Sequence, residues 1–181
     1  MFTITNHLVD QAEFIESPNF SERTEGVEPT LLVIHNISLP PGEFGGSYIV
    51  DFFQNNLDSS KHPFFKEIVN LQVSSHLFIN RKGDLIQFVE LSKKAWHAGA
   101  SEFEGQKECN DFSIGIELEG TDTEPYSDEQ YSSLIDLTQC LIKTYSKITN
   151  ERIVGHCDIA PTRKTDPGES FDWSRYRSSL A

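Results

Sequence analysis

The chain carries little positive charge. It has 15 Lys and Arg against 28 Asp and Glu, which gives a formal net charge of −13 over 181 residues. Nucleic-acid binding needs clustered Lys and Arg to neutralise phosphates, and the sequence has no such cluster. Nucleic acid is therefore excluded as a partner, and attachment to an anionic membrane surface is disfavoured for the same reason. Nothing in the composition indicates an obligate protein partner.

Long apolar runs and paired cysteines are also lacking. No run approaches the ~20 apolar residues of a membrane-spanning helix. The segment from Met1 to His7 shows none of the basic, apolar and cleavage-site pattern of a secretory signal. Cys109, Cys140 and Cys157 are odd in number and widely spaced, so no disulfide framework is indicated. These features predict a cytoplasmic protein.

The residues that are present predict a single α/β domain. Hydrophobic residues make up 37% and charged residues 24% of the chain, which is an ordinary globular composition. Apolar or alternating runs bounded by turn residues predict strands at 31–34, 73–79, 85–89, 113–119 and 153–156. Helices are predicted over 48–56 and after a capping box that starts at Ser127. About four or five strands flanked by helices give the α/β class.

The first 29 residues differ from the rest, because they are polar and interrupted by proline. We expect them to form a lead-in packed on a catalytic domain of residues 30–181, with a short helix before Ser17-Pro18. The segment 97–110 is polar, contains glycine and has no periodicity, so it is predicted to be a surface loop.

Metal-ligating side chains occur near the ends of two predicted strands. His156 and Asp166 belong to the loop after the strand at 153–156, and His35 follows another apolar run. Two histidines and a nearby carboxylate can supply the three protein ligands of a catalytic zinc, which leaves a fourth position for water. Strand ends are rigid enough to aim both imidazoles into one cleft. The set predicts a metal-dependent hydrolase.

Glu117 and Lys164 are the candidate catalytic side chains. Glu117 lies on the polar side of the alternating strand 113–119 and is the candidate general base. Lys164 precedes Asp166 by two residues, so an extended backbone would point both side chains the same way and place an ammonium beside a developing oxyanion. Each residue also has an ordinary interpretation: a hydrogen-bonded histidine, a solvated strand glutamate, or an aspartate that begins a turn before Pro167. The pattern is discontinuous, so the residues alone leave both interpretations open.

Four segments resemble a known family. They are Val33–Gly45, Ala95–Gly99 (Ala-Trp-His-Ala-Gly), Cys109–Gly120 and Ile153–Gly168. In order and spacing they are similar to N-acetylmuramoyl-L-alanine amidases and peptidoglycan-recognition proteins, in particular to the cytosolic amidases of bacterial cell-wall recycling. The resemblance implies a mixed central sheet flanked by helices, with a zinc cleft at the sheet edge. It also implies cleavage of the amide between the lactyl group of 1,6-anhydro-N-acetylmuramic acid and L-alanine in small muropeptides.

The resemblance assigns roles to nine residues. His35, His156 and Asp166 match the family's zinc ligands, Glu117 its base and Lys164 its oxyanion stabiliser, with Zn²⁺ as the only cofactor. Four further residues fall in motifs that line the sugar-peptide groove of the family: Asn36, Trp96, His97 and Arg163. Trp96 would stack on a sugar face or pack into the core, and Arg163 would pair with a peptide carboxylate.

Two other functions are considered. A non-catalytic muropeptide-recognition module would share the fold, but it would not need the three ligands and the two catalytic side chains that this chain has. An exported amidase that cuts intact cell wall would be expected to carry an export signal and a wall-anchoring repeat, and neither is visible in the sequence. The sequence therefore favours the cytoplasmic zinc amidase.

Overall fold

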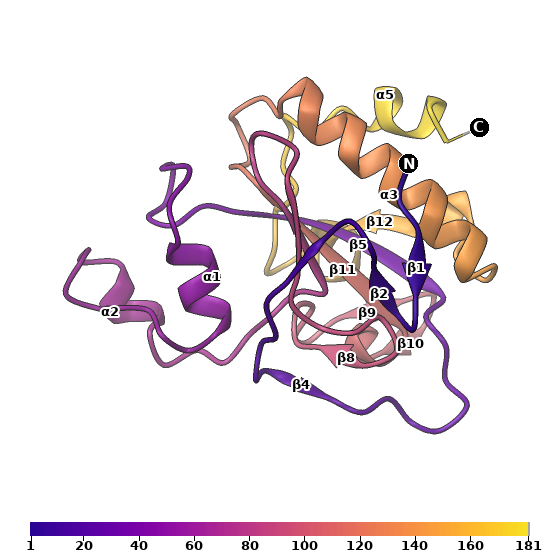
Figure 1. Ribbon diagram of the computed structural model, residues 1–181, viewed down its shortest axis with the longest axis horizontal. Helices are drawn as coiled ribbons and strands as arrows, with labels where there is room; N and C mark the ends of the chain where they lie inside the picture. The colour runs from indigo at the N-terminus through magenta and orange to yellow at the C-terminus, as the bar shows by residue number, and fades with distance from the viewer. Residues whose placement is uncertain (181) are drawn as a thin grey trace.

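A six-stranded mixed sheet forms the centre of the computed structural model, which describes residues 1–180. Its strands lie in the order β12-β5-β11-β6-β7-β3 (Figure 1). The bounds are β3 Glu13–Phe14, β5 Leu31–Ile37, β6 Leu77–Ile79, β7 Leu85–Gln87, β11 Ser113–Glu119 and β12 Ile153–Gly155. The β6–β7 pair is antiparallel and the other pairs are parallel. The predicted α/β class with a mixed sheet is confirmed.

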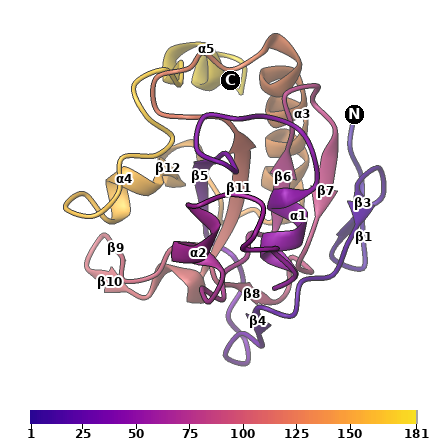
Figure 2. The same ribbon diagram turned by 90° about the vertical axis from the view of Figure 1, so that its left-hand side faces the viewer.

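Helices cover both faces of this sheet. The long helix α3 (Asp128–Thr144) and the C-terminal α5 (Trp173–Ser178) lie on one face, and α1 (Tyr48–Phe53) and α2 (Phe65–Ile68) lie together on the opposite side (Figures 1 and 2). Alternation along β11 explains the first layer, because Ile114, Ile116 and Leu118 point into the core that α3 covers. The polar alternate residues of β11 are left for the other face, where the candidate site lies.

The N-terminal segment contributes strands and no helix. It forms a hairpin of β1 (Ile4–Thr5) and β2 (Leu8–Val9), then β3 at the sheet edge and β4 (Phe20–Ser21), which pairs with β8 (Lys94–Ala95). The prediction of a short helix before Ser17-Pro18 is wrong. The central sheet has six strands, whereas four or five were expected. Strands of two residues are too short to show an alternating pattern, so they cannot be predicted from periodicity. The division of the chain at residue 29 stays a prediction.

Several other segments differ in their bounds from the prediction, among them the strands expected at 31–34 and 85–89 and the helix expected over 48–56. The strand expected at 73–79 is shorter, because backbone groups of Ser74 and His76 bond to Trp96 and Gly115 before β6 begins. His156 is the first residue of the short helix α4 (His156–Ile159) and does not end a strand. The expected loop 97–110 contains a small hairpin of β9 (Glu102–Phe103) and β10 (Gln106–Lys107) and leads into the 3₁₀ turn η1 (Cys109–Asp111). A second 3₁₀ turn, η2 (Asn150–Arg152), precedes β12.

Helix α3 begins at the predicted capping box. The Ser127 hydroxyl accepts the backbone N–H of Gln130 at 3.1 Å, and the Gln130 side-chain oxygen accepts the backbone N–H of Ser127 at 3.1 Å. The same hydroxyl donates to the Arg81 carbonyl oxygen at 2.7 Å, so the cap also ties α3 to the β6–β7 turn. Along the part of the chain that the structure describes, no helix combines the length and the apolar character needed to cross a membrane.

Replacing this cap should destabilise the protein measurably. We expect Ser127→Ala to lower the free energy of unfolding by about 1 kcal/mol, because the Gln130 N–H loses the hydroxyl that accepts it and the Arg81 carbonyl oxygen loses its donor. Urea denaturation followed by circular dichroism measures the difference. Ser132→Ala, at an exposed position inside the same helix, is the control and should leave the midpoint nearly unchanged. Equal effects of the two substitutions would contradict the role of the cap.

Candidate metal centre and active-site cleft

Parallel pairing of β5 with β11 places two functional side chains next to each other. The register sets His35 directly opposite Glu117. Both belong to the face of the sheet that α3 does not cover, because their strand neighbours Ile34 and Ile116 point into the core beneath α3. His35 is only 1% exposed, whereas Glu117 is half-buried and borders a cavity. His35 and Glu117 are far apart in the sequence, and only the register of the sheet makes them neighbours.

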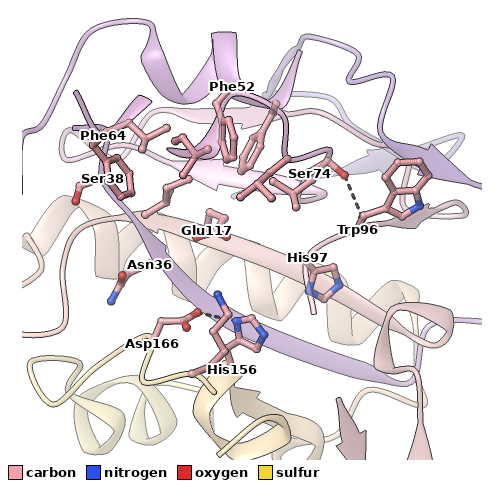
Figure 3. A pocket seen from close by; sticks show the side chains of 17 residues that line it. Asn36, Ser38, Phe52, Phe64, Ser74, Trp96, His97, Glu117, His156 and Asp166 are labelled. Carbon is pink, nitrogen blue, oxygen red and sulfur yellow. Dashed lines mark hydrogen bonds and ion pairs between the residues drawn. The ribbon is translucent and has the colours of Figure 1, made fainter. Parts of the chain in front are cut away.

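The loop after β12 brings the other two candidate ligands to His35. His156 begins α4, and the Cys157 backbone N–H donates to the Asp166 carbonyl oxygen at 2.9 Å, which folds the loop back on itself. The Nδ1 atoms of His35 and His156 lie 2.9 Å apart, and Asp166 Oδ2 lies 3.0 Å from each of them. Figure 3 shows Asp166 and His156 together on one side of the cleft. These three residues form a group that can hold a metal ion.

Burial sets the charge state of this group. It lowers the pKa of His35 to about 4, so the imidazole is neutral at neutral pH. Burial alone would raise the pKa of Asp166, but the neighbouring His156 and His35 side chains outweigh it and hold that pKa well below its usual range. A neutral imidazole and an ionised carboxylate are the forms in which these side chains bind metal.

The arrangement of protons also fits a metal ion. His156 Nε2 lies 3.0 Å from the Ala98 carbonyl oxygen, which can only accept, so Nε2 carries the proton and Nδ1 of a neutral ring presents its lone pair. That lone pair faces Asp166 Oδ2, which is itself an acceptor. A cation between them satisfies both atoms together with His35 Nδ1. Two imidazole nitrogens and one carboxylate oxygen are a donor set typical of catalytic zinc.

Glu117 and Lys164 border the same space. Burial, and to a lesser extent the charge of Asp166, raises the pKa of Glu117 well above its usual value, while Lys164 opposes this rise. The Glu117 Oε2 atom is buried and has no hydrogen-bond partner within residues 1–180. A buried carboxylate oxygen without a partner is a group that a water molecule or a substrate would satisfy. Its raised pKa suits a general base that works near neutral pH.

The cleft between these residues and α1–α2 is a cavity of about 380 Å³. Its polar side holds Glu117, His156, Lys164 and Asp166. Its apolar side comes from α1, α2 and the segment after α2: Phe52, Phe53, Phe64, Ile68, Leu71 and Val73. Figure 3 shows Phe52 and Phe64 across the cleft from Asp166 and His156, with Glu117 between the two sides. The cleft can therefore hold a ligand that has both apolar and polar surface.

Comparison with known proteins identifies the family. The model of the N-acetylmuramoyl-L-alanine amidase family matches residues 25–169. The chain belongs to this family. It is 52% identical over 177 residues to the 1,6-anhydro-N-acetylmuramyl-L-alanine amidase AmpD of Haemophilus influenzae, covering 98% of this chain and 96% of the relative. The predicted resemblance is confirmed, and the protein is an amidase.

Solved structures agree with this assignment. A crystal structure of a selenomethionine AmpD derivative superposes with a TM-score of 0.95 at 49% identity, covering 98% of this chain and 99% of that one. The amidase AmiD of Escherichia coli, solved with the substrate anhydro-N-acetylmuramic acid-L-Ala-D-γ-Glu-L-Lys, superposes with a TM-score of 0.63 at 30% identity, covering 89% of this chain and 65% of that one. The fold of the amidase is thus shared with enzymes that act on muramyl peptides.

Three of the four expected substrate contacts line the main cavity of the amidase: Asn36, Trp96 and His97. Arg163 borders an adjoining polar hollow that also contains Asn36, Lys164 and Asp166. The guanidinium of Arg163 donates to the carbonyl oxygens of Ala98 and Ala100, so part of its hydrogen-bonding capacity is already used. Whether these side chains contact substrate stays a prediction.

The N-terminal segment supports the wall of the cavity, which was not predicted from the sequence. Asn19 is 2% exposed, and its Nδ2 donates to the Val73 carbonyl oxygen at 2.8 Å. The backbone carbonyl oxygen of Asn19 accepts the Ser74 hydroxyl at 2.6 Å. The Trp96 indole N–H donates to the Ser21 hydroxyl at 3.1 Å. Short strands and lone polar residues gave no signal of these contacts, which join segments far apart in the chain. The polar lead-in therefore shapes the active-site cleft.

Neutralising Glu117 should stabilise the metal-free amidase. A group with a raised pKa contributes fully below its unfolded-state pKa, about 4.3 for Glu, and loses that contribution as the pH rises through the folded-state pKa. Glu117→Gln is neutral at every pH and escapes this loss. We expect the variant to equal the wild type near pH 4 and to exceed it in unfolding free energy at pH 7–8. Urea denaturation with chelator present measures the difference.

The control for this experiment is Glu124→Gln, at an exposed position. This substitution should not produce a gap from wild type that widens with pH. A Glu117→Gln variant whose stability differs from wild type by the same amount at pH 4 and pH 8 would show that the carboxyl group is not held neutral by burial.

Proposed function

We propose that this amidase hydrolyses the amide bond between the lactyl group of 1,6-anhydro-N-acetylmuramic acid and L-alanine in soluble muropeptides. Near-full-length similarity to AmpD of Haemophilus influenzae supports this substrate, and the AmiD neighbour was solved with an anhydro-muramyl peptide. The observation that carries the proposal is the meeting of His35, His156 and Asp166 at 2.9–3.0 Å beside an unpartnered Glu117 oxygen. This arrangement suits metal-assisted hydrolysis of an amide.

Zinc is the metal we propose for the three-residue group. The two imidazole nitrogens and one carboxylate oxygen match its usual donor set, and all three side chains are held by neighbouring backbone or side-chain contacts. When bound, zinc supplies Lewis acidity, which lets water be deprotonated at neutral pH and polarises a carbonyl group. His35, His156 and Asp166 would hold it, and the remaining chemistry belongs to the protein side chains.

Glu117 moves the proton. In the proposed reaction its carboxylate accepts a proton from the attacking water while the water oxygen bonds to the lactyl carbonyl carbon. The C–N bond then breaks, and Glu117 returns the proton to the leaving amino group of L-alanine. The products are a free carboxylic acid and a free amine, so water is consumed and no other co-reactant is needed. The raised pKa of Glu117 makes its carboxylate a stronger base for the proton of water.

Lys164 stabilises the negative charge that forms on the carbonyl oxygen. It borders both the main cavity and the adjoining polar hollow. The stabilising charge is in place before the reaction, and a preorganised charge is worth more inside a partly buried cleft than in water.

Two sides of the cleft suit two parts of the substrate. The sugar is proposed to contact the main cavity, whose lining includes Trp96 and Asn36. The peptide is proposed to extend along the adjoining hollow, where Arg163 would meet a carboxylate. We also propose that the protein acts in the cytoplasm, because Cys109, Cys140 and Cys157 are free thiols. Fractionation of the native host against compartment markers tests the location.

Mass spectrometry of an anhydro-muropeptide incubated with the protein tests the function. We expect release of the intact peptide from anhydro-N-acetylmuramic acid. The masses of the two products together should exceed the mass of the substrate by one water. A chelator should abolish the release, and added Zn²⁺ should restore it. Intact cell wall offered in parallel separates a recycling enzyme from a wall-lytic one. A protein that binds the muropeptide without cleaving it, with or without Zn²⁺, would overturn the proposal in favour of a recognition module.

Two substitutions separate metal binding from catalysis. Asp166→Ala should lose bound zinc, whereas Glu117→Gln should keep about one zinc per chain and lose about 10²–10⁴-fold in kcat, the usual contribution of general acid–base catalysis. Metal content by atomic absorption and turnover by chromatography measure the two effects. Unchanged turnover in Glu117→Gln would remove this residue from the mechanism.

Lys164→Met tests the oxyanion assignment. The substitution keeps the side-chain length and removes the charge, so we expect kcat to fall about 10²–10³-fold while zinc content stays at the wild-type level. Lys107→Met, at an exposed position on β10, is the matched control. A loss confined to KM would assign Lys164 to substrate binding and not to the transition state.

A further inference from the structure

The two histidine ligands are both held by one dipeptide, His97-Ala98. His35 Nε2 lies 2.9 Å from His97 Nδ1, and His156 Nε2 lies 3.0 Å from the Ala98 carbonyl oxygen. The outward nitrogens of both imidazoles thus contact consecutive residues of a loop that follows β8, while their Nδ1 atoms face each other and Asp166. Nothing in the local sequence around either ligand indicates this shared support.

The proton positions follow from these contacts. For His35 Nδ1 to offer a lone pair to a metal, the proton of the neutral ring must sit on Nε2, which then donates to His97 Nδ1. His97 Nδ1 must be an acceptor, so the proton of neutral His97 sits on Nε2. That atom lies 3.0 Å from the hydroxyl oxygen of Ser113, which is fully buried. Both hydrogen bonds, from His35 to His97 and from His97 to Ser113, are therefore made when His35 has the metal-binding tautomer.

The dipeptide is itself fixed in place. The backbone N–H groups of His97 and Ala98 both donate to the side-chain oxygen of Asn110, at 3.1 and 2.8 Å. The His97 ring packs directly on β11 at Gly115, where a Cβ atom would lie 2.5 Å from His97 Cγ. Glycine at this position gives the ring room to lie between His35 and Ser113. The ring meets His35 edge-on, with centroids 5.0 Å apart.

His97 is thereby less suited to the substrate contact expected from the sequence. Its ring borders the cavity, but Nδ1 faces His35 and Nε2 faces Ser113. Both polar atoms of the ring are used inside the protein, so the ring offers a substrate only its carbon edge. Its hydrogen bonds point toward the metal ligands.

We propose that His97 is a positioning residue for the metal centre, with its side chain orienting His35 and its neighbour's carbonyl orienting His156. The inference rests on the proposed metal site of the amidase. Partners of this kind fix the tautomer and ring orientation of histidine ligands, and losing one typically costs about 10–100-fold in metal affinity.

Zinc affinity of His97 variants tests the proposal. Competition with a chromophoric chelator gives the dissociation constant for wild type, His97→Phe, His97→Asn and Ser113→Ala. We expect His97→Phe, which keeps an aromatic ring without nitrogens, to bind zinc about 10–100-fold more weakly. His97→Asn should recover most of that loss, because its amide oxygen can accept from His35 Nε2 near the position of Nδ1. Ser101→Ala, in the same loop without contact to the ligands, is the control and should bind like wild type.

The order of the variants separates positioning from packing. A purely structural ring would be replaced better by Phe than by Asn, so an affinity in His97→Phe equal to wild type, or higher than in His97→Asn, would overturn the proposal. Wild-type protein that binds no zinc would instead refute the metal site on which the proposed function depends. The two failures are therefore distinguishable without any measurement of turnover.

A second measurement uses the unaltered protein. Long-range ¹H–¹⁵N spectra of the zinc-loaded wild type report which ring nitrogen of each histidine carries the proton. We expect His35 and His97 both to carry it on Nε2. A proton on Nδ1 of His97 in the wild type would overturn the proposal even if the variants failed to fold.

Discussion

The pairing of β5 with β11 is the constraint on which the rest of the site depends. Parallel register over seven residues sets His35 opposite Glu117 and leaves both on the face that α3 does not cover. If either strand slipped by one residue, its own side chain, His35 or Glu117, would turn into the apolar core, because strand side chains alternate. The apolar residues that alternate with them along the two strands, such as Ile34 and Ile116, are buried under α3 and hold the register. Hydrophobic burial on one face thus positions the polar chemistry on the other.

Burial also creates the reactivity of the polar face. The same desolvation that keeps His35 neutral raises the pKa of Glu117, and each shift suits the role proposed for its residue. Asp166 differs, because two imidazoles beside it keep it ionised despite burial. One partly buried face therefore holds a neutral ligand, an ionised ligand and a basic carboxyl group within a few side chains. Such differences between neighbouring titratable groups are typical of catalytic sites and cost stability in the folded protein.

The surroundings of the site come from segments far from it in the sequence. The N-terminal strands hold Trp96 and the segment at Val73 in place through Ser21 and Asn19, and the loop after β8 holds the two imidazoles. α1 and α2 add the apolar wall. The cleft is therefore built from the central strands, the N-terminal segment, the loop after β8, and α1 and α2. A division into a lead-in and a catalytic domain describes the order of the sequence better than the construction of the cleft.

The sequence by itself determined the α/β class, the strand at 113–119, the capped helix after Ser127 and the identity of the candidate ligands. These features depend on local periodicity, on capping chemistry and on motif resemblance, which can be read residue by residue. Only the tertiary structure decided the register that pairs His35 with Glu117, the sixth strand from the N-terminal segment and the inward hydrogen bonds of His97. These depend on contacts between distant segments, whose hydrogen bonds and close packing leave no periodic trace in the residues that make them.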